Sequence, residues 1–207
     1  MIRGVVSDFG GVLTSPLMLA FAQMQDVIDV PPEAYGPAMK HSLERDGEHP
    51  LYAIERGEIS EPEFLGRIER GLEAALRRPV SLHGYGAHFM DALQPNHELF
   101  DRYRELRGRG LRFALCTNNV REWEPLWRSM LPIDELFEVV VDSAFVGTRK
   151  PEPEIYAITL EQLGLPAADC AFVDDLEVNV AAAREAGMHG IHFRDTAQAI
   201  AELEALL

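Results

Sequence analysis

A chain of 207 residues, 47% hydrophobic and 26% charged, is long enough for one buried core and a smaller accessory unit. Its formal net charge of −15 argues against a nucleic-acid or anionic-membrane partner, because both require a basic surface to neutralise phosphate groups. A small anionic substrate is compatible with this charge, since a pocket can be locally positive on an acidic protein.

Short apolar and β-branched runs predict the strands of a sheet. They lie at 4–7, 111–116, 139–141 and 170–173, with a weaker run at 190–193. These runs show almost no polar alternation, which is typical of strands covered on both faces, as in a parallel sheet. Helical patterns lie between them, at 97–108, 121–130, 153–163, 177–186 and 196–206. Strand and helix alternate from residue 97 onward, which predicts a doubly wound α/β fold.

The stretch between the first two predicted strands differs in character. It contains no convincing strand, and its amphipathic helical segments lie at 17–29, 33–45, 50–56 and 61–77. Ser60 to Glu63 has the pattern of a capping box for the last segment, with Pro62 in the first helical turn. We therefore predict an α/β core domain made of residues 1–14 and 96–207, with an all-helical domain, residues 15–95, inserted after the first strand.

The apolar segments and the two cysteines bear on the cellular location of the protein. No apolar secretory segment precedes the first acidic residue, Asp8, and the apolar run 17–22 is too short to span a bilayer. Cys116 and Cys170 lie in apolar stretches, which favours buried thiols over a disulfide. We expect a cytoplasmic protein, a monomer or a homodimer, that binds neither membrane nor nucleic acid.

Polar residues follow several predicted strands, where ligands bind in open parallel sheets. Asp8 follows the first strand, and Gly10 and Gly11 behind it permit a tight loop and a close approach of the backbone to a ligand. The Asp-Phe-Gly sequence also occurs in protein kinases, but this chain lacks a Gly-rich nucleotide loop and a catalytic-loop Asp/Asn pair. A plain turn remains the alternative interpretation.

Thr117 and Asn118 follow the second predicted strand. A hydroxyl and an amide at this position can donate hydrogen bonds to a phosphate oxygen. The alternative is that they cap the next helix, a position that both residue types favour.

Lys150 is a candidate because lysine is rare in this chain. Of nineteen basic residues only Lys40 and Lys150 are lysine, and a compact ammonium enters tight sites that a planar guanidinium cannot. Pro151 and Pro153 restrict the backbone behind Lys150 and begin a helix, so we expect its ammonium to be held in place. The alternative is an isolated surface lysine.

Asp174 and Asp175 give the most specific signal. Two adjacent carboxylates at the end of a buried strand repel each other unless a cation or a lysine lies near them. Hard oxygen ligands at a partly hydrated site suit Mg²⁺. Asn179, four residues beyond Asp175, could orient this loop.

Taken in order, these segments resemble the four motifs of the haloacid dehalogenase-like hydrolases. The matching segments are 7–14, 115–118, 149–156 and 172–179 with 181–187. The last two are especially similar to the amino-terminal phosphatase domain of bifunctional epoxide hydrolases. They also resemble bacterial sugar-phosphate phosphatases, to which the stretch 55–60 is similar. The resemblance implies a Rossmann-like core, and the helical insert corresponds to the mobile cap of the family.

The resemblance also implies roles for the candidate residues. Asp8 would attack phosphorus and form an aspartyl-phosphate. Mg²⁺ would bind to Asp8, Asp175 and the carbonyl group of Gly10, with Asp174 touching metal-bound water or Lys150.

The phosphoryl oxygens would be held by Thr117, Asn118 and Lys150, and Lys150 would also lower the pKa of Asp8 so that it stays ionised. The predicted substrate contacts are Gly11, Asn118 and Arg56, and Glu58 is a further candidate. Nothing else between 15 and 95 indicates a ligand.

One position departs from the family pattern. Phosphatases of this family usually carry a general acid two residues after the nucleophile, where this chain has Gly10. Losing proton transfer costs ~10²–10⁴-fold in rate if nothing replaces it. We predict a Mg²⁺-dependent phosphomonoesterase acting on a small phosphorylated metabolite such as a sugar phosphate. The alternatives are a haloalkanoate dehalogenase, in which halide departure needs no proton, and a degenerate member that binds a phosphorylated ligand without turnover.

Overall fold

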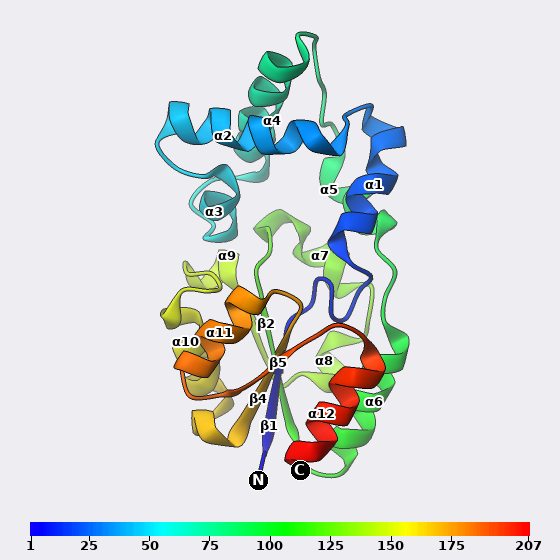
Figure 1. The fold of residues 1–207 in the computed structure, drawn as a ribbon, viewed down its shortest axis with the longest axis vertical. Helices are drawn as coiled ribbons and strands as arrows, with labels where there is room; N and C mark the ends of the chain where they lie inside the picture. Colours follow the sequence, from blue (N-terminus) through cyan, green and yellow to red (C-terminus); the bar gives the residue numbers. More distant parts are fainter.

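The computed structural model describes residues 1–207, apart from the side chain of Asp26. Five parallel strands form one sheet in the order β3-β2-β1-β4-β5 (Figure 1). Their bounds are β1 Gly4–Ser7, β2 Arg112–Thr117, β3 Val139–Asp142, β4 Cys170–Asp174 and β5 His189–His192. Every predicted strand is present, with ends that differ by at most one residue, so the predicted doubly wound α/β fold is confirmed.

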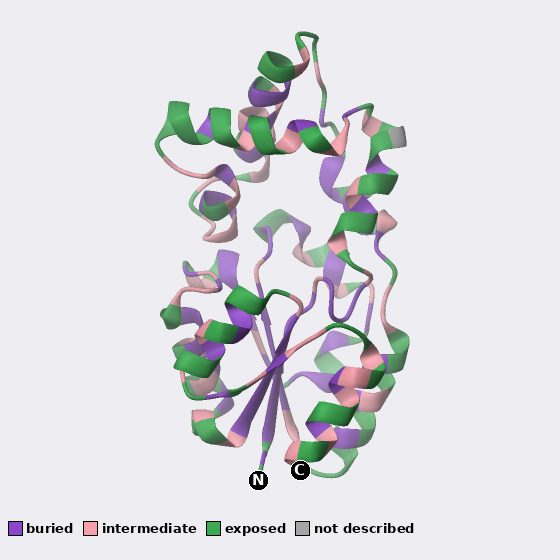
Figure 2. Ribbon diagram, in the orientation of Figure 1, coloured by how far each residue is buried: buried purple, intermediate pink, exposed green. Residues whose placement is uncertain are grey.

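Alternate residues of the strands face two separate hydrophobic clusters. Val5 faces the cluster that includes the inner sides of α6 (His97–Gly108) and α12 (Thr196–Leu206). Val6 faces the other cluster, formed with α10 (Pro153–Leu163) and α11 (Glu177–Glu185). The two helix pairs cover opposite faces of the sheet, as Figure 1 shows, and β1 and β4 are buried throughout (Figure 2). Burial on both faces explains why the strands are apolar runs.

The helices of the insert stand beyond the carboxyl ends of the strands (Figure 1). They are α1 Leu17–Ile28, η1 Pro32–Ala34, α2 Tyr35–Asp46, α3 Pro50–Glu55, α4 Glu61–Leu76 and α5 Tyr85–Ala92. We call this segment the cap and the rest the core. The four predicted helices of the cap are present, whereas α5 was not expected from the sequence.

The two crossings between core and cap run side by side. The Ser15 amide donates to the Gln94 carbonyl at 2.7 Å, and the Asn96 amide donates to the Leu13 carbonyl at 2.8 Å. Thr14 and Pro95 form an antiparallel bridge between these bonds. The pairing falls at the predicted boundaries 14/15 and 95/96, although the division into two domains itself stays a prediction.

Two local predictions are wrong. The expected helix 121–130 is broken into η2 (Arg121–Trp123) and α7 (Glu124–Arg128), because Pro125 begins a new helix. Ser60 does precede α4, but its side chain forms no capping hydrogen bond. The Glu61 amide instead donates to Glu122 of the core at 3.2 Å. The Glu122 carboxylate, rather than the Ser60 side chain, therefore accepts a hydrogen bond from the first turn of α4.

Three short elements were also not predicted: α8 Ile133–Leu136, α9 Ser143–Val146 and η3 Ala167–Asp169. Within the part of the chain that the structure describes, no helix has both the length and the hydropathy needed to cross a bilayer.

Candidate active site

Three carboxylates meet at the carboxyl end of the sheet. Ser7 of β1 pairs with Val173 of β4, so the residues that follow them, Asp8 and Asp174, are neighbours. One carboxylate oxygen from each of Asp8, Asp174 and Asp175 lies within 4.8 Å of the others. Three anionic groups this close require a compensating cation. Oxygen donors of this kind match the preference of Mg²⁺.

Lys150 supplies part of that compensation. Its Nζ lies 2.7 Å from Asp8 Oδ1 and 2.7 Å from Asp174 Oδ2. The Lys150 side chain is 1% exposed and that of Asp174 is fully buried, so each depends on the other for its charge balance. The alternative interpretation of Lys150 as a surface lysine is therefore wrong.

Asp174 has donors on both carboxylate oxygens. Besides Lys150, it accepts hydrogen bonds from the Leu176 amide at 2.9 Å and from Asn179 Nδ2 at 3.0 and 3.1 Å. Asp174 was expected to contact either metal-bound water or Lys150, and the structure shows the contact with Lys150. Asn179 holds this loop through Asp174 rather than through Asp175, from which its spacing was counted. Asp175 is less buried than Asp174 and remains available to a cation.

The pKa of Asp8 differs from the prediction. Burial raises it, Lys150 lowers it, and the neighbouring Asp174 and Asp175 raise it again, which brings the pKa to about 7. Lys150 lowers the pKa of Asp8 in the predicted direction, but desolvation outweighs the ammonium, so the net change for the side chains by themselves is upward. Burial lowers the pKa of Lys150, but Asp174 and Asp8 raise it by more, so Lys150 stays charged. A bound divalent cation would favour ionised Asp8.

Gly11 allows Asp175 to approach. Its φ is +77°, a conformation that L side chains rarely adopt, and a Cβ on this residue would lie 2.3 Å from Asp175 Oδ2. The Gly11 amide donates to Thr14 Oγ1 at 3.0 Å. That amide is already used, so the structure gives no support to the predicted substrate contact of Gly11.

Asn118 holds the main chain of Lys150. Its Nδ2 donates to the Lys150 carbonyl at 3.0 Å, and its Oδ1 accepts from the Lys150 amide at 2.8 Å. Both groups of this amide therefore position the lysine, and a contact of the Asn118 side chain with substrate stays a prediction. The capping alternative for Thr117 and Asn118 is wrong, because the next helical turn begins at Arg121 with Val120 in the capping position.

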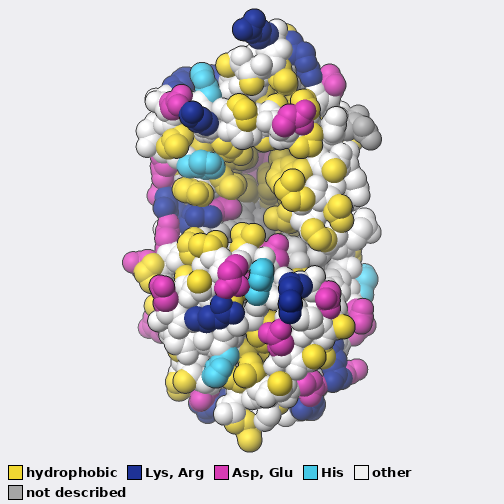
Figure 3. Space-filling view, viewed as in Figure 1, with side chains coloured by type: hydrophobic (Ala, Val, Ile, Leu, Met, Phe, Trp, Pro, Cys, Tyr) yellow, Lys and Arg dark blue, Asp and Glu magenta, His cyan; other side chains and the backbone are white. Residues whose placement is uncertain are grey.

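A cavity of about 230 Å³ lies between the cap and the core. Its polar floor contains Gly10, Thr117 and Asn118, next to Asp8. The walls are mainly apolar and aromatic: Leu17, Phe21, Met39, Leu51, Phe64, Tyr85, Phe89, Met90, Leu93 and Trp123. Figure 3 shows hydrophobic side chains bordering the hollow between cap and core.

The sequence did not reveal this wall. The spacing of Tyr85 and Phe89, at i and i+4, could have indicated an aromatic helix face on α5. Trp123 and Trp127 are four residues apart in the sequence, but they lie in different surroundings. Trp127 is buried 5.2 Å from the Phe9 ring, whereas Trp123 lines the cavity and donates to Glu61 of the cap at 2.7 Å.

Arg56 has different partners from those predicted. It donates from Nε to Glu152 of the core at 2.9 Å and from Nη1 to Glu48 at 2.9 Å. Neither Arg56 nor the exposed Glu58 lines the cavity, so the structure gives no support to their predicted contact with substrate. The cap residue that does reach the cavity is their neighbour Glu55.

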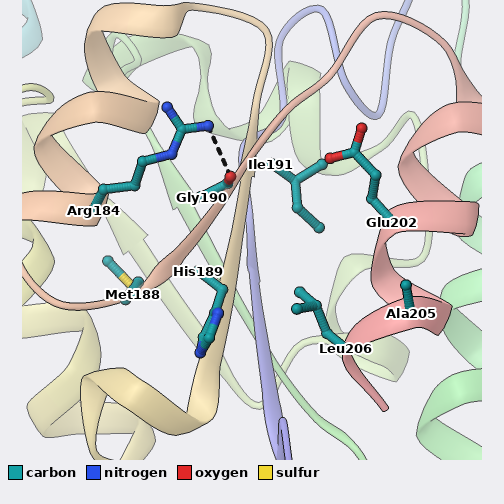
Figure 4. Close-up of a pocket in the computed structure, with 8 residues that line it drawn as sticks. All are labelled: Arg184, Met188, His189, Gly190, Ile191, Glu202, Ala205 and Leu206. Carbon is teal, nitrogen blue, oxygen red and sulfur yellow. Dashed lines mark hydrogen bonds between the residues drawn. The ribbon is translucent and has the colours of Figure 1, made fainter.

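A second depression lies beside the edge strand β5, between α11 and α12 (Figure 4). Arg184 donates to the Gly190 carbonyl at 2.9 Å on one side of it, and Glu202 and Leu206 lie on the other. The three-carboxylate cluster, and with it the candidate chemistry, lies elsewhere, at the carboxyl end of the sheet.

Comparison with known sequences identifies the family. The sequence model described as "Hydrolase: haloacid dehalogenase-like hydrolase" matches residues 2–187. The chain belongs to the haloacid dehalogenase-like hydrolases. The predicted resemblance is therefore confirmed. The three clustered carboxylates come from the first and the last of the four matching segments, 7–14 and 172–179.

Two relatives extend the comparison. The chain is 31% identical over 211 residues to acyl-CoA dehydrogenase family member 10 of Mus musculus, covering 99% of this chain and 19% of that protein. It is 34% identical over 122 residues to the sesquiterpene phosphatase astK of Aspergillus oryzae, covering 56% of this chain and 59% of that protein. The hydrolase thus spans only part of the length of each relative.

A solved structure supports the fold. The HAD family enzyme bt-2542 of Bacteroides thetaiotaomicron, in complex with magnesium and inorganic phosphate, superimposes with a TM-score of 0.65 at 21% identity. The match covers 91% of this chain and 92% of that chain.

Proposed function

We propose that this hydrolase is a Mg²⁺-dependent phosphomonoesterase that acts on a phosphate ester with an apolar alcohol group. The observation that carries the proposal is the position of Lys150 between Asp8 and Asp174, in a three-carboxylate cluster beside an apolar cavity. A site of this kind can bind a dianionic phosphate and a cation on one side and a hydrocarbon on the other.

The donors fit Mg²⁺. Asp8, Asp175 and the carbonyl group of Gly10 would hold the ion, while Asp174 is occupied by Lys150 and Asn179. When bound, the ion would offset negative charge on the transferring phosphoryl group. The relative crystallised with magnesium and phosphate supports this assignment.

The side chains of the protein would then perform a two-step transfer. Asp8 attacks phosphorus, the bond from phosphorus to the ester oxygen breaks, and the alcohol leaves. Water then attacks the aspartyl-phosphate and releases phosphate, which restores Asp8. Lys150 and Thr117 would hold phosphoryl oxygens during both steps.

The cavity favours an apolar alcohol over a sugar. Burial of apolar surface contributes roughly 25 cal/mol per Å². Sugar hydroxyls in the same space would lose water without gaining enough hydrogen-bond partners, which is unfavourable. The name of the sesquiterpene phosphatase relative agrees with an apolar alcohol. We therefore prefer this class to the sugar phosphate suggested by the sequence.

The test is phosphate release from paired substrates. Alkyl and isoprenyl monophosphates are compared with sugar monophosphates, with and without Mg²⁺, for the wild type and Asp8→Asn. We expect Mg²⁺-dependent release from the apolar esters and none from the variant. Equal release by both proteins would overturn the proposed nucleophile, and a preference for sugar phosphates would overturn the substrate class.

One observation favours a second candidate. Gly10 leaves the core without the usual acid, and a haloalkanoate dehalogenase needs none. Such an enzyme would not require the cation that three adjacent carboxylates demand. Mg²⁺-independent chloride release from 2-chloropropionate would support it. Mg²⁺-dependent binding of phosphate esters without any turnover would instead identify a degenerate member.

A further inference from the structure

The proposed phosphatase reaction needs a proton donor that the core does not supply at residue 10. The leaving alcohol must be protonated in the first step, and water must lose a proton in the second. Gly10 has no side chain to do either. Among the described residues that line the cavity, only Glu55 carries a carboxyl group.

The loop that carries Glu55 is docked on the core. Glu55 is the last residue of α3, and Arg56 behind it donates to Glu152 of the core at 2.9 Å. Gly57 has φ +68°, and a Cβ on it would lie 2.3 Å from the Ala144 carbonyl oxygen. Only glycine allows this close contact, so the backbone next to Glu55 is held against the core.

The carboxylate of Glu55 has one protein partner. Arg149 donates to its Oε2, and the Arg149 guanidinium lies 4.3 Å above the Tyr52 ring. Within the described residues no hydrogen bond reaches Oε1 of Glu55. The side chain is 13% exposed and lines the same cavity as Gly10 and Thr117. One oxygen is therefore fixed and the other is left for a group in the cavity.

We propose that Glu55, from the cap, is the general acid and base of this enzyme in place of residue 10. The proposal rests on the proposed phosphomonoesterase function. In the first step the Glu55 carboxyl proton passes to the ester oxygen as the bond from Asp8 to phosphorus forms. In the second step the Glu55 carboxylate takes a proton from the water that attacks the aspartyl-phosphate.

The electrostatic surroundings suit both roles. Burial raises the pKa of Glu55, whereas the facing cations Arg149, Lys150 and Arg56 lower it, and the net change is upward. A carboxyl group whose pKa moves toward neutrality can both donate and accept a proton near pH 7.

The test uses two esters of similar size. The alcohol of p-nitrophenyl phosphate leaves without help, whereas that of phenyl phosphate is a poorer leaving group and depends on an acid. We expect Glu55→Gln to lower kcat/KM for phenyl phosphate by ~10²–10⁴-fold, the range of general acid catalysis. The loss for p-nitrophenyl phosphate should be below about tenfold, because that alcohol needs little proton transfer.

Two further variants separate chemistry from cap docking. Glu152→Gln removes the docking ion pair with Arg56 but keeps Glu55 and Arg149, and we expect it to affect both esters by the same factor. Position 10 has room for a side chain, since a Cβ there would meet only the flexible Leu17 side chain, at 3.3 Å or more. Gly10→Asp in the Glu55→Gln background should therefore restore hydrolysis of phenyl phosphate.

The outcomes are distinguishable. An active wild type with equal loss for both esters in Glu55→Gln, and no rescue by Gly10→Asp, overturns the role of Glu55 and leaves the phosphatase intact. A wild type that hydrolyses neither ester, with Asp8→Asn indistinguishable from it, overturns the proposed function and this inference together.

Discussion

Substitution of Gly11 tests how strictly the loop behind Asp8 is built. Gly11→Ala adds a Cβ in a left-handed conformation, which costs roughly 1–2 kcal/mol in the folded state. The same Cβ would lie 2.3 Å from Asp175 Oδ2, whereas ordinary contact begins near 3.4 Å. Asp175 must therefore move by about 1 Å, and a misplacement of that size can lower a rate ~10²-fold.

Gly47→Ala is the matched control. Gly47 has φ +80°, close to the +77° of Gly11, and a Cβ on it would meet nothing within 4 Å. Both variants should lose about 1–2 kcal/mol in the free energy of unfolding, measured by urea denaturation. Only Gly11→Ala should lose about 10²-fold in kcat/KM and need more Mg²⁺ for half-maximal rate.

Hydrolysis of the best ester by Gly11→Ala within threefold of the rate of Gly47→Ala, at the same Mg²⁺ concentration, would contradict this prediction. That result would mean that Asp175 can move without a loss of kcat/KM, so the exact position of this carboxylate would not determine activity.

Three other features lead to direct measurements. Asn118→Ala removes both hydrogen bonds to the Lys150 main chain, so the free energy of unfolding should fall by about 1–3 kcal/mol. We also expect kcat to fall by a larger factor than KM rises, and an unchanged kcat would contradict the positioning role of Asn118. Burial raises the pKa of Asp142 from 3.8 to about 6, so folded Asp142 binds its proton more tightly and stability falls as pH rises between these values. Asp142→Asn removes this dependence, and its stability relative to the wild type, from urea titrations, should improve by about 2–3 kcal/mol between pH 4 and pH 7.5; a difference that does not vary with pH would contradict it. Burial raises the pKa of Cys116 and of Cys170 to about 11, so neither thiol should react with Ellman's reagent faster than the protein unfolds; rapid labelling of the native protein would show that one is accessible.

The core could be predicted because burial on two faces leaves a simple pattern. β4 is apolar from Cys170 to Val173 and ends at Asp174, so the same pattern locates both the strand and the carboxylate. Lys150 was recognisable because this chain so rarely uses lysine. The strand pattern is local, whereas the rarity of lysine is a property of the whole chain.

The cavity could not be predicted because its residues have no common local pattern. Leu17, Phe89 and Trp123 each have the sequence pattern of ordinary core residues, and only folding brings them to one side of Asp8. Asn118 holds a residue 32 positions away, a contact that no spacing indicates. Arg56 and Glu58 were predicted to face the site, whereas the fold of α3 and the loop behind it directs their neighbour Glu55 into the cavity.

The central position of β1 has a consequence for synthesis of the chain. Gly4 pairs on one side with Arg112 and on the other with Cys170, so both neighbours of β1 are made more than a hundred residues later. After β1 leaves the ribosome, this apolar strand therefore stays unpaired while the cap is translated. The helices of the cap can form during that time. Such a delayed, non-local closure is slow and leaves the strand open to aggregation. We expect nascent β1 to depend on chaperones until β4 has emerged.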